Sequence, residues 1–127
     1  METEKTLTHT LLKLQGQRLS AITFIHDYLQ LTFDSESANA VLNVYSQSTL
    51  NTGHQNLIWL SNGFTDLLRL CINQFIMNTL VNECRISLYF SNGVALLVPY
   101  GSPDHPSPES FELKINCVEG EAIWVVA

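Results

Sequence analysis

The stretch Tyr28-Leu29-Gln30-Leu31-Thr32-Phe33 is the clearest strand signal in the chain. Its leucines and its phenylalanine alternate with Tyr28, Gln30 and Thr32. Because successive side chains of a strand point to opposite faces, this pattern predicts a half-buried strand with one apolar and one polar face. The preceding His26-Asp27 pair predicts a short turn.

Alternation of the same kind continues on both sides of this stretch. Counting this stretch, eight segments have strand character, and one of them, 80–81, is short, so we expect about six to seven strands, separated by short polar or glycine-containing stretches. Asn92-Gly93 is a strong hairpin signal, because we expect a turn in which both residues have a positive φ. The segments with strand character are 20–24, 40–45, 80–81, 85–90, 94–98, 111–115 and 122–126.

One amphipathic helix is expected at about 63–77. Apolar residues recur there at steps of three and four from Phe64 to Phe75, which makes one broad apolar face. Asn62 is a suitable N-cap, and Asp66 lies in the first turn, where the helix dipole favours a negative charge. The sequence does not decide whether residues 1–16 form a helix or a strand, because a leucine stripe favours a helix and the many threonines disfavour it.

Residues 18–45 and 79–100 share one pattern of strand, turn and return strand. The match is explained either by duplication or by chance, since any half-buried antiparallel strand alternates. A duplicated unit would be a small antiparallel meander, and two such units would stack or form one curled sheet around the helix. We therefore expect an α+β fold, mainly antiparallel sheet packed on one helix, in a single domain spanning 1–127.

The stretch from Gly16 to Phe33, with Asp27-Tyr28-Leu29-Gln30-Leu31-x-Phe33 at its core, resembles the opening of small uncharacterised bacterial proteins. In these proteins a short strand leads into Asp-Tyr-(Val/Leu)-Gln-Leu-x-Phe. The Phe90-x-x-Gly93 hairpin, Pro108-Glu109 and the segment Trp124-Val125-Val126 are similar too. The resemblance implies a bacterial protein of similar fold over most of the chain, and it implies no catalytic residue.

The charge of the chain bears on its partners and its location. Twelve acidic residues face six basic ones, for a net charge of −6, whereas nucleic-acid binders carry a basic stripe. We therefore expect no nucleic-acid or membrane partner, while a basic or neutral protein is allowed. The first residues lack a signal-peptide pattern, and the longest aliphatic run, 94–98, is too short to cross a bilayer, so a cytoplasmic location is expected.

Residues capable of catalysis or metal binding are scattered. Two acidic residue–histidine pairs occur, His26-Asp27 and Asp104-His105, and Glu109 could join the second pair. Neither has the further residues that catalysis or metal binding would need, and His9 and His54 are isolated in the sequence. No nucleotide-binding loop or hydrolase elbow occurs in the sequence. We expect no cofactor and no metal, and we lean against an enzyme. The cysteines, expected to be reduced and packed as small apolar residues, are Cys71, Cys84 and Cys117.

Outward-pointing aromatic residues supply the one positive functional signal. Tyr28, Tyr45 and Tyr89 fall on the polar sides of predicted strands, and tyrosine is enriched in recognition surfaces. Asp104 and His105, in a proline-rich loop, complete the candidate surface. The first hypothesis is a non-enzymatic protein-interaction module that binds another protein or a second copy of itself. The alternative is a small-ligand-binding protein or enzyme with a pocket between sheet and helix.

Overall fold

The computed structural model describes residues 2–101 and 109–127, and among them it contains ten strands and two short helices. All strand pairings are antiparallel, so the mainly antiparallel α+β class is confirmed, but the strands outnumber the six to seven that were predicted. The elements are α1 (Glu2–Leu12), β1 (Arg18–Ile25), β2 (Tyr28–Asp34), β3 (Ala38–Val44), β4 (Thr49–Asn51), β5 (Asn56–Ile58), α2 (Phe64–Arg69), β6 (Ile76–Val81), β7 (Arg85–Phe90), β8 (Ala95–Pro99), β9 (Phe111–Cys117) and β10 (Ala122–Val126).

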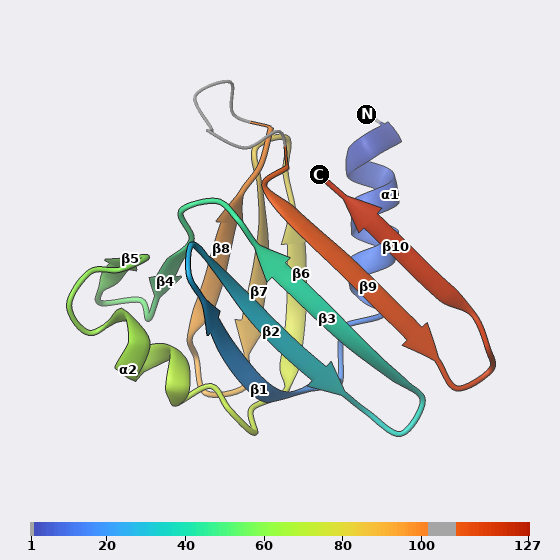
Figure 1. The fold of residues 1–127 in the computed structure, drawn as a ribbon, viewed down its shortest axis with the longest axis horizontal. Helices are drawn as coiled ribbons and strands as arrows, with labels where there is room; N and C mark the ends of the chain where they lie inside the picture. Colours follow the sequence, from blue (N-terminus) through green and yellow to red (C-terminus); the bar gives the residue numbers. More distant parts are fainter. Residues whose placement is uncertain (1, 102–108) are drawn as a thin grey trace.

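The strands form two five-stranded sheets that face each other (Figure 1). The first sheet has the order β1-β2-β3-β9-β10 and the second has the order β5-β4-β8-β7-β6. The chain thus builds three strands of the first sheet, all of the second, and then returns to the first. The meanders β1-β2-β3 and β6-β7-β8 occupy the two stretches that share a sequence pattern, and their duplication stays a prediction.

The hydrophobic core fills the space between the sheets. The alternating apolar residues of β2, led by Leu31 and Phe33, are fully buried, as are Leu88 on β7 and Leu96 on β8. Each such side chain contributes about 2 kcal/mol through removal of apolar surface from water. The alternation that marks the strands in the sequence therefore reports burial between two sheets.

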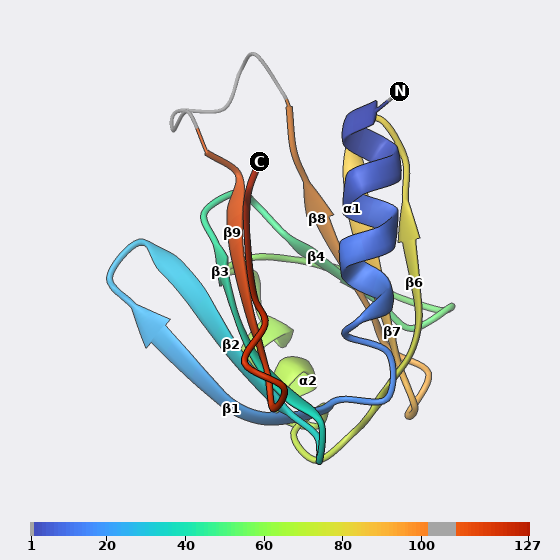
Figure 2. The ribbon, with the colours of Figure 1, turned by 90° about the vertical axis from the view of Figure 1, so that its right-hand side faces the viewer.

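The N-terminal segment is helical. Leu7 and Leu11 on α1 are buried, and Leu14 in the turn after this helix is buried too, so the leucine stripe decides the conformation. Figure 2 shows α1 running alongside β6 at one open side of the two sheets. Gln15 donates a hydrogen bond across this junction to Thr79 on β6 at 3.3 Å.

The helix expected at 63–77 was wrong in its length and in its cap. α2 ends at Arg69 and begins after Gly63, which has a φ of 88° and provides no side-chain cap. Asn73 adopts a left-handed φ of 73°, and residues 73–76 pair with the start of β1. The Asn73 amide donates to the Leu19 carbonyl at 2.8 Å. Pairing with a distant strand has therefore replaced the second half of the expected helix.

Two local features of the fold differ from what the sequence predicts. The hairpin at Ser91-Asn92-Gly93 connects β7 to β8, but within this turn only Gly93 has a positive φ, so the expected turn geometry was wrong. Residues 46–56 lie outside every segment with predicted strand character, yet they contain β4 and the first residue of β5. Leu50 on β4 is fully buried, and a single apolar residue is too weak a signal to predict a strand.

Candidate functional site

The outer face of the first sheet carries a cluster of aromatic, amide and charged side chains from four neighbouring strands. These are the outward members of strands whose alternate residues are buried in the core. We call this cluster the Glu112 face. It consists of Tyr28 and Gln30 on β2, Asn43 on β3 and Tyr45 just after it, Glu112 and Lys114 on β9, and Trp124 on β10.

Strand register brings the polar members of the Glu112 face into rows. Gln30 faces Asn43, and Asn43 in turn faces Glu112. On the neighbouring row Lys114 faces Trp124. Side chains that face each other on antiparallel strands are close enough to interact. The pairing of β3 with β9, two strands far apart in the sequence, is therefore what assembles the face.

A chain of hydrogen bonds converges on the Glu112 carboxylate. Gln30 Nε2 donates to Asn43 Oδ1 at 2.9 Å, and Asn43 Nδ2 donates to Glu112 Oε1 at 3.1 Å. The Tyr45 hydroxyl donates to the same oxygen at 3.3 Å. Trp124 Nε1 donates to Glu112 Oε2 at 2.8 Å. One carboxylate thus restrains side chains from both neighbouring strands: Asn43 on β3, Tyr45 just after β3, and Trp124 on β10.

These contacts determine the charge state of the face. The hydrogen bond from Asn43 has the largest effect and lowers the pKa of Glu112. Burial has the next largest effect and raises it, while the Trp124 bond, the Lys114 charge and the Tyr45 bond lower it further, so the net pKa is below the ordinary value. Burial raises the pKa of Tyr45, and the charge and hydrogen bond of Glu112 raise it further. At neutral pH the carboxylate is therefore ionised and accepts hydrogen bonds, while the phenol keeps its proton and donates one.

The aromatic rings of the face are held beside one another or beside a cation. The rings of Tyr28 and Tyr45 lie 5.1 Å apart at an angle of 55°. Lys114 Nζ lies 5.7 Å from the centre of the Trp124 ring, a separation typical of a cation–π contact. Trp124 is nevertheless 67% exposed. Its ring is restrained in position and still offers most of its area to a partner.

The structure separates the five residues of the predicted surface. It brings Tyr28 and Tyr45 into contact on the Glu112 face. Tyr89 lies on β7, on the outward side of the second sheet, where it faces Ala95. Asp104 and His105 lie outside the described residues. The predicted surface is therefore not one cluster, and two of its members belong to the Glu112 face.

Sequence reasoning missed Glu112 and Trp124 as members of the site. Alternation within 111–115 already places Glu112 outward, on the side opposite Phe111. Nothing local in the sequence reveals that Asn43 and Tyr45 lie next to it. The missing information is the order of the strands in the sheet.

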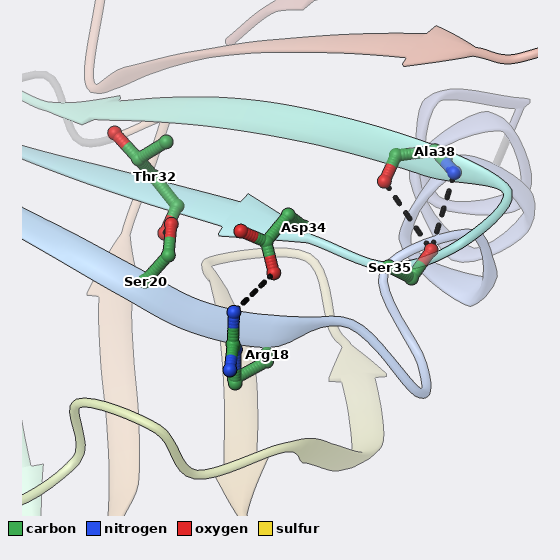
Figure 3. A network of polar contacts seen from close by, with 6 residues as sticks. All are labelled: Arg18, Ser20, Thr32, Asp34, Ser35 and Ala38. Atoms are coloured by element: carbon green, nitrogen blue, oxygen red, sulfur yellow. Dashed lines mark hydrogen bonds and ion pairs between the residues drawn. The ribbon is translucent and has the colours of Figure 1, made fainter.

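A second group of polar contacts lies where β1, β2 and the β2–β3 turn meet (Figure 3). Arg18 pairs with Asp34 at 3.3 Å, and both side chains are more than 40% exposed. Ser35 exchanges hydrogen bonds with the backbone of Ala38, each at 3.2 Å. Exposed ion pairs contribute little free energy. We therefore interpret this group as support for the turn.

The histidines of the other candidate sites are exposed. His26 lies with Asp27 in the expected turn between β1 and β2, His54 lies in the loop between β4 and β5, and His9 is on α1. Among residues 2–101 and 109–127, no three His, Cys, Asp or Glu side chains are grouped as a metal ion requires. The candidate metal set with Asp104 and His105 falls largely outside the described residues.

The cysteines differ in burial. Cys71 is buried, as expected, whereas Cys84 is exposed, so the prediction that all three are packed was wrong. Burial raises the pKa of the Cys71 thiol to about 11. Cys71 is therefore a protonated core residue at neutral pH.

Comparison with protein-family models, with curated proteins and with solved structures found no match to this chain. Within the described part of the chain, neither helix has the length and apolar character needed to span a bilayer. Any function assigned to the chain therefore depends on the geometry of the described residues.

Proposed function

We propose that this protein is a non-enzymatic interaction module that binds a protein partner through the Glu112 face. The observation that carries the proposal is that one ionised carboxylate restrains Asn43, Tyr45 and Trp124 by hydrogen bonds of 2.8 to 3.3 Å. Binding then costs less side-chain entropy, because these groups are already ordered. Restrained aromatic rings flanked by amides are typical of recognition surfaces.

The charge of the face indicates the chemistry of the partner. A carboxylate offers about four lone-pair positions, and Asn43, Tyr45 and Trp124 use three of those on Glu112. A donor from the partner has room at the fourth. Arginine is well suited, because its guanidinium both donates to carboxylates and stacks on aromatic rings. The net charge of −6 would also favour a basic partner.

The test compares two tyrosine variants on opposite sheets. Tyr28→Ser removes a ring from the Glu112 face, and Tyr89→Ser removes an outward ring from the second sheet. Immobilised wild-type protein and both variants are exposed to an extract of the source cells, and captured proteins are identified by mass spectrometry. A protein retained by wild type and Tyr89→Ser but lost with Tyr28→Ser supports the proposal, once calorimetry with the purified partner gives at least tenfold weaker binding for Tyr28→Ser.

The opposite pattern contradicts this assignment. If Tyr89→Ser loses the partner and Tyr28→Ser keeps it, the binding surface lies on the second sheet. Circular dichroism of both variants shows whether they are folded, and both changes are outside the core. Loss of binding in a folded variant can then be assigned to the surface.

The alternative, a small-ligand-binding protein or enzyme, has one observation in its favour. An open groove of about 610 Å³ lies beside β8, lined by residues that include Arg85, Tyr100 and Thr49. Its volume is within the range of ligand sites. It lies on the outer side of the second sheet, and neither His26 nor His54 lines it. Thermal-shift screening of wild type against Arg85→Ala would detect a small anion that binds there.

A further inference from the structure

We propose that β10 pairs with β10 of a second copy of this chain, antiparallel and about a two-fold axis at Trp124. The first sheets of the two copies would then form one continuous sheet. This inference goes beyond the proposed function and does not rest on it, because it concerns the backbone edge of β10 rather than the outer face of the sheet.

The backbone groups of β10 show which of its residues are open to a partner. Ala127 and Phe111 exchange two backbone hydrogen bonds, at 2.9 and 3.0 Å. Alternate residues of a strand direct their N–H and C=O groups to opposite sides. Ala122, Trp124 and Val126 therefore direct theirs away from β9, and no described residue bonds them.

β10 lacks the devices that usually protect a free edge. Its sequence, Ala122-Ile123-Trp124-Val125-Val126, has no charge and no proline, and its pairing with β9 has no bulge. Trp124 and Val126 are 67% and 42% exposed. Such an edge is a template for pairing with another strand. In Figure 1 α1 lies behind the C-terminal half of β10, and the view in Figure 2 shows that the helix is set apart from this strand.

The other edge strands within the described residues are less open. The start of β1 is bridged to Phe75, just ahead of β6. β6 has an irregularity between Ile76 and Asn78, and α1 lies beside it. β5 has three residues. β10 is therefore the edge best prepared for strand addition.

A two-fold axis at Trp124 satisfies the open backbone groups of both copies. Trp124 would face Trp124 of the second copy, and Ala122 would face Val126 of the second copy. Because the outward groups belong to these residues, each facing pair exchanges two hydrogen bonds. The small Ala122 lies opposite the larger Val126, and no charged side chain lies in the seam. The strand is thus complementary to itself, which is why a second copy is the favoured occupant.

The association should be reversible and should strengthen with salt. A five-residue edge buries less than the roughly 1,200 Å² typical of stable complexes. Each copy carries a net charge of −6, so the copies repel each other. Salt screens this repulsion over a Debye length of about 10 Å at 0.1 M. Because the paired strands carry no charged side chains, screening does not weaken the contacts between them.

The first test measures mass in solution by sedimentation velocity, from low micromolar to near-millimolar concentrations. We expect wild type to shift from monomer to dimer, at lower concentration in higher salt. Ala122→Pro removes an outward N–H without touching the bonds to β9, and should keep the protein monomeric across the range. The matched control Ala122→Ser keeps the N–H and should dimerise as wild type does. A wild type that stays monomeric throughout, or an Ala122→Pro variant that dimerises equally well, would overturn the proposal.

The second test reads the register and does not depend on Ala122→Pro being folded. In a background with Cys84→Ser and Cys117→Ser, Trp124→Cys places two thiols at the axis. Their Cα atoms would be about 5.5 Å apart, within disulfide range, so mild oxidation should give a covalent dimer. Val126→Cys faces Ala122 of the second copy and should cross-link far less. Equal cross-linking of both variants, or none with Trp124→Cys, would contradict this register.

Discussion

The outward faces of the two sheets differ in how their side chains are held. On the first sheet, Glu112 binds side chains from β10 and from both ends of the Asn43–Tyr45 segment. On the second sheet, Tyr89 is 36% exposed and makes no side-chain hydrogen bond or ring contact with the described residues. Both faces come from the same alternation of apolar and outward residues. The difference lies in the neighbours that strand order supplies.

This contrast shows that an outward tyrosine has two possible meanings. Tyr28 is held by Tyr45, whose hydroxyl is bonded to Glu112, so both rings are ordered before a partner arrives. Tyr89 lies between Asn78 on β6 and Ala95 on β8 in the strand register, and its side chain makes no hydrogen bond to a described residue. The strand propensity of tyrosine alone accounts for Tyr89. Tyr28 is in addition preorganised by its neighbours, which lowers the entropy cost of binding.

The largest expected effects concern the inner faces, where the two sheets should behave alike. Phe33→Ala on β2 and Leu88→Ala on β7 each empty a fully buried site. We expect them to lower the free energy of unfolding by about 3–5 and 2–5 kcal/mol respectively. Urea denaturation followed by circular dichroism should give one transition for each variant, since the sheets share one core. Two separate transitions would show that the sheets unfold independently.

The next effect should distinguish the outer faces. Glu112→Gln replaces a carboxylate oxygen by an amide group that points a donor at Asn43 or Trp124, which are themselves donors. We expect a loss of about 1 kcal/mol in unfolding free energy, typical of a broken hydrogen-bond network. Glu121→Gln, at an exposed position before β10, is the matched control and should change stability little. Equal effects of the two changes would mean that the Glu112 network does not stabilise the sheet.

The parts of the fold that were predicted correctly depend on local pattern. Each strand that buries an apolar residue at every second position, such as β2 or β9, was visible in the sequence. The error at 63–77 came from the same reliance on local spacing. Phe75 continues the spacing of the apolar stripe, yet its backbone pairs with the start of β1. A spacing pattern cannot register a competitor more than fifty residues away.

The candidate site shows the same limit. The direction of Tyr28 and Tyr45 follows from alternation, and their contact follows once β2 and β3 are neighbours in the sheet. The place of Glu112 depends on β9 returning beside β3. Neither strand carries a residue that encodes this pairing. The tyrosines were therefore predictable and the carboxylate that orders one of them was not.

The pH dependence of stability should also distinguish the two faces. The pKa of Glu112 is lowered in the folded protein from its ordinary value of 4.5, chiefly by the bond from Asn43. Its contribution is therefore present above pH 4.5 and is lost as the pH falls through the folded pKa. The stability gap between wild type and Glu112→Gln should narrow on acidification, as measured by urea denaturation at a series of pH values. A gap that stays constant into strong acid would contradict the lowered pKa.

The smallest expected effect lies at alkaline pH and tests the link between Glu112 and Tyr45 directly. Burial and the neighbouring Glu112 raise the pKa of Tyr45 above its ordinary value of 10.0. The resulting stabilisation is complete below pH 10 and is lost as the pH rises through the folded pKa. Ultraviolet difference spectra follow ionisation of the phenols, and comparison with Tyr45→Phe assigns the titration of this one. In Glu112→Gln the Tyr45 pKa should fall toward its ordinary value but stay above it, because burial remains. An unchanged titration would mean that the carboxylate does not hold this ring. It would then contradict the proposal that the side chains of the first sheet are preorganised and those of the second are not.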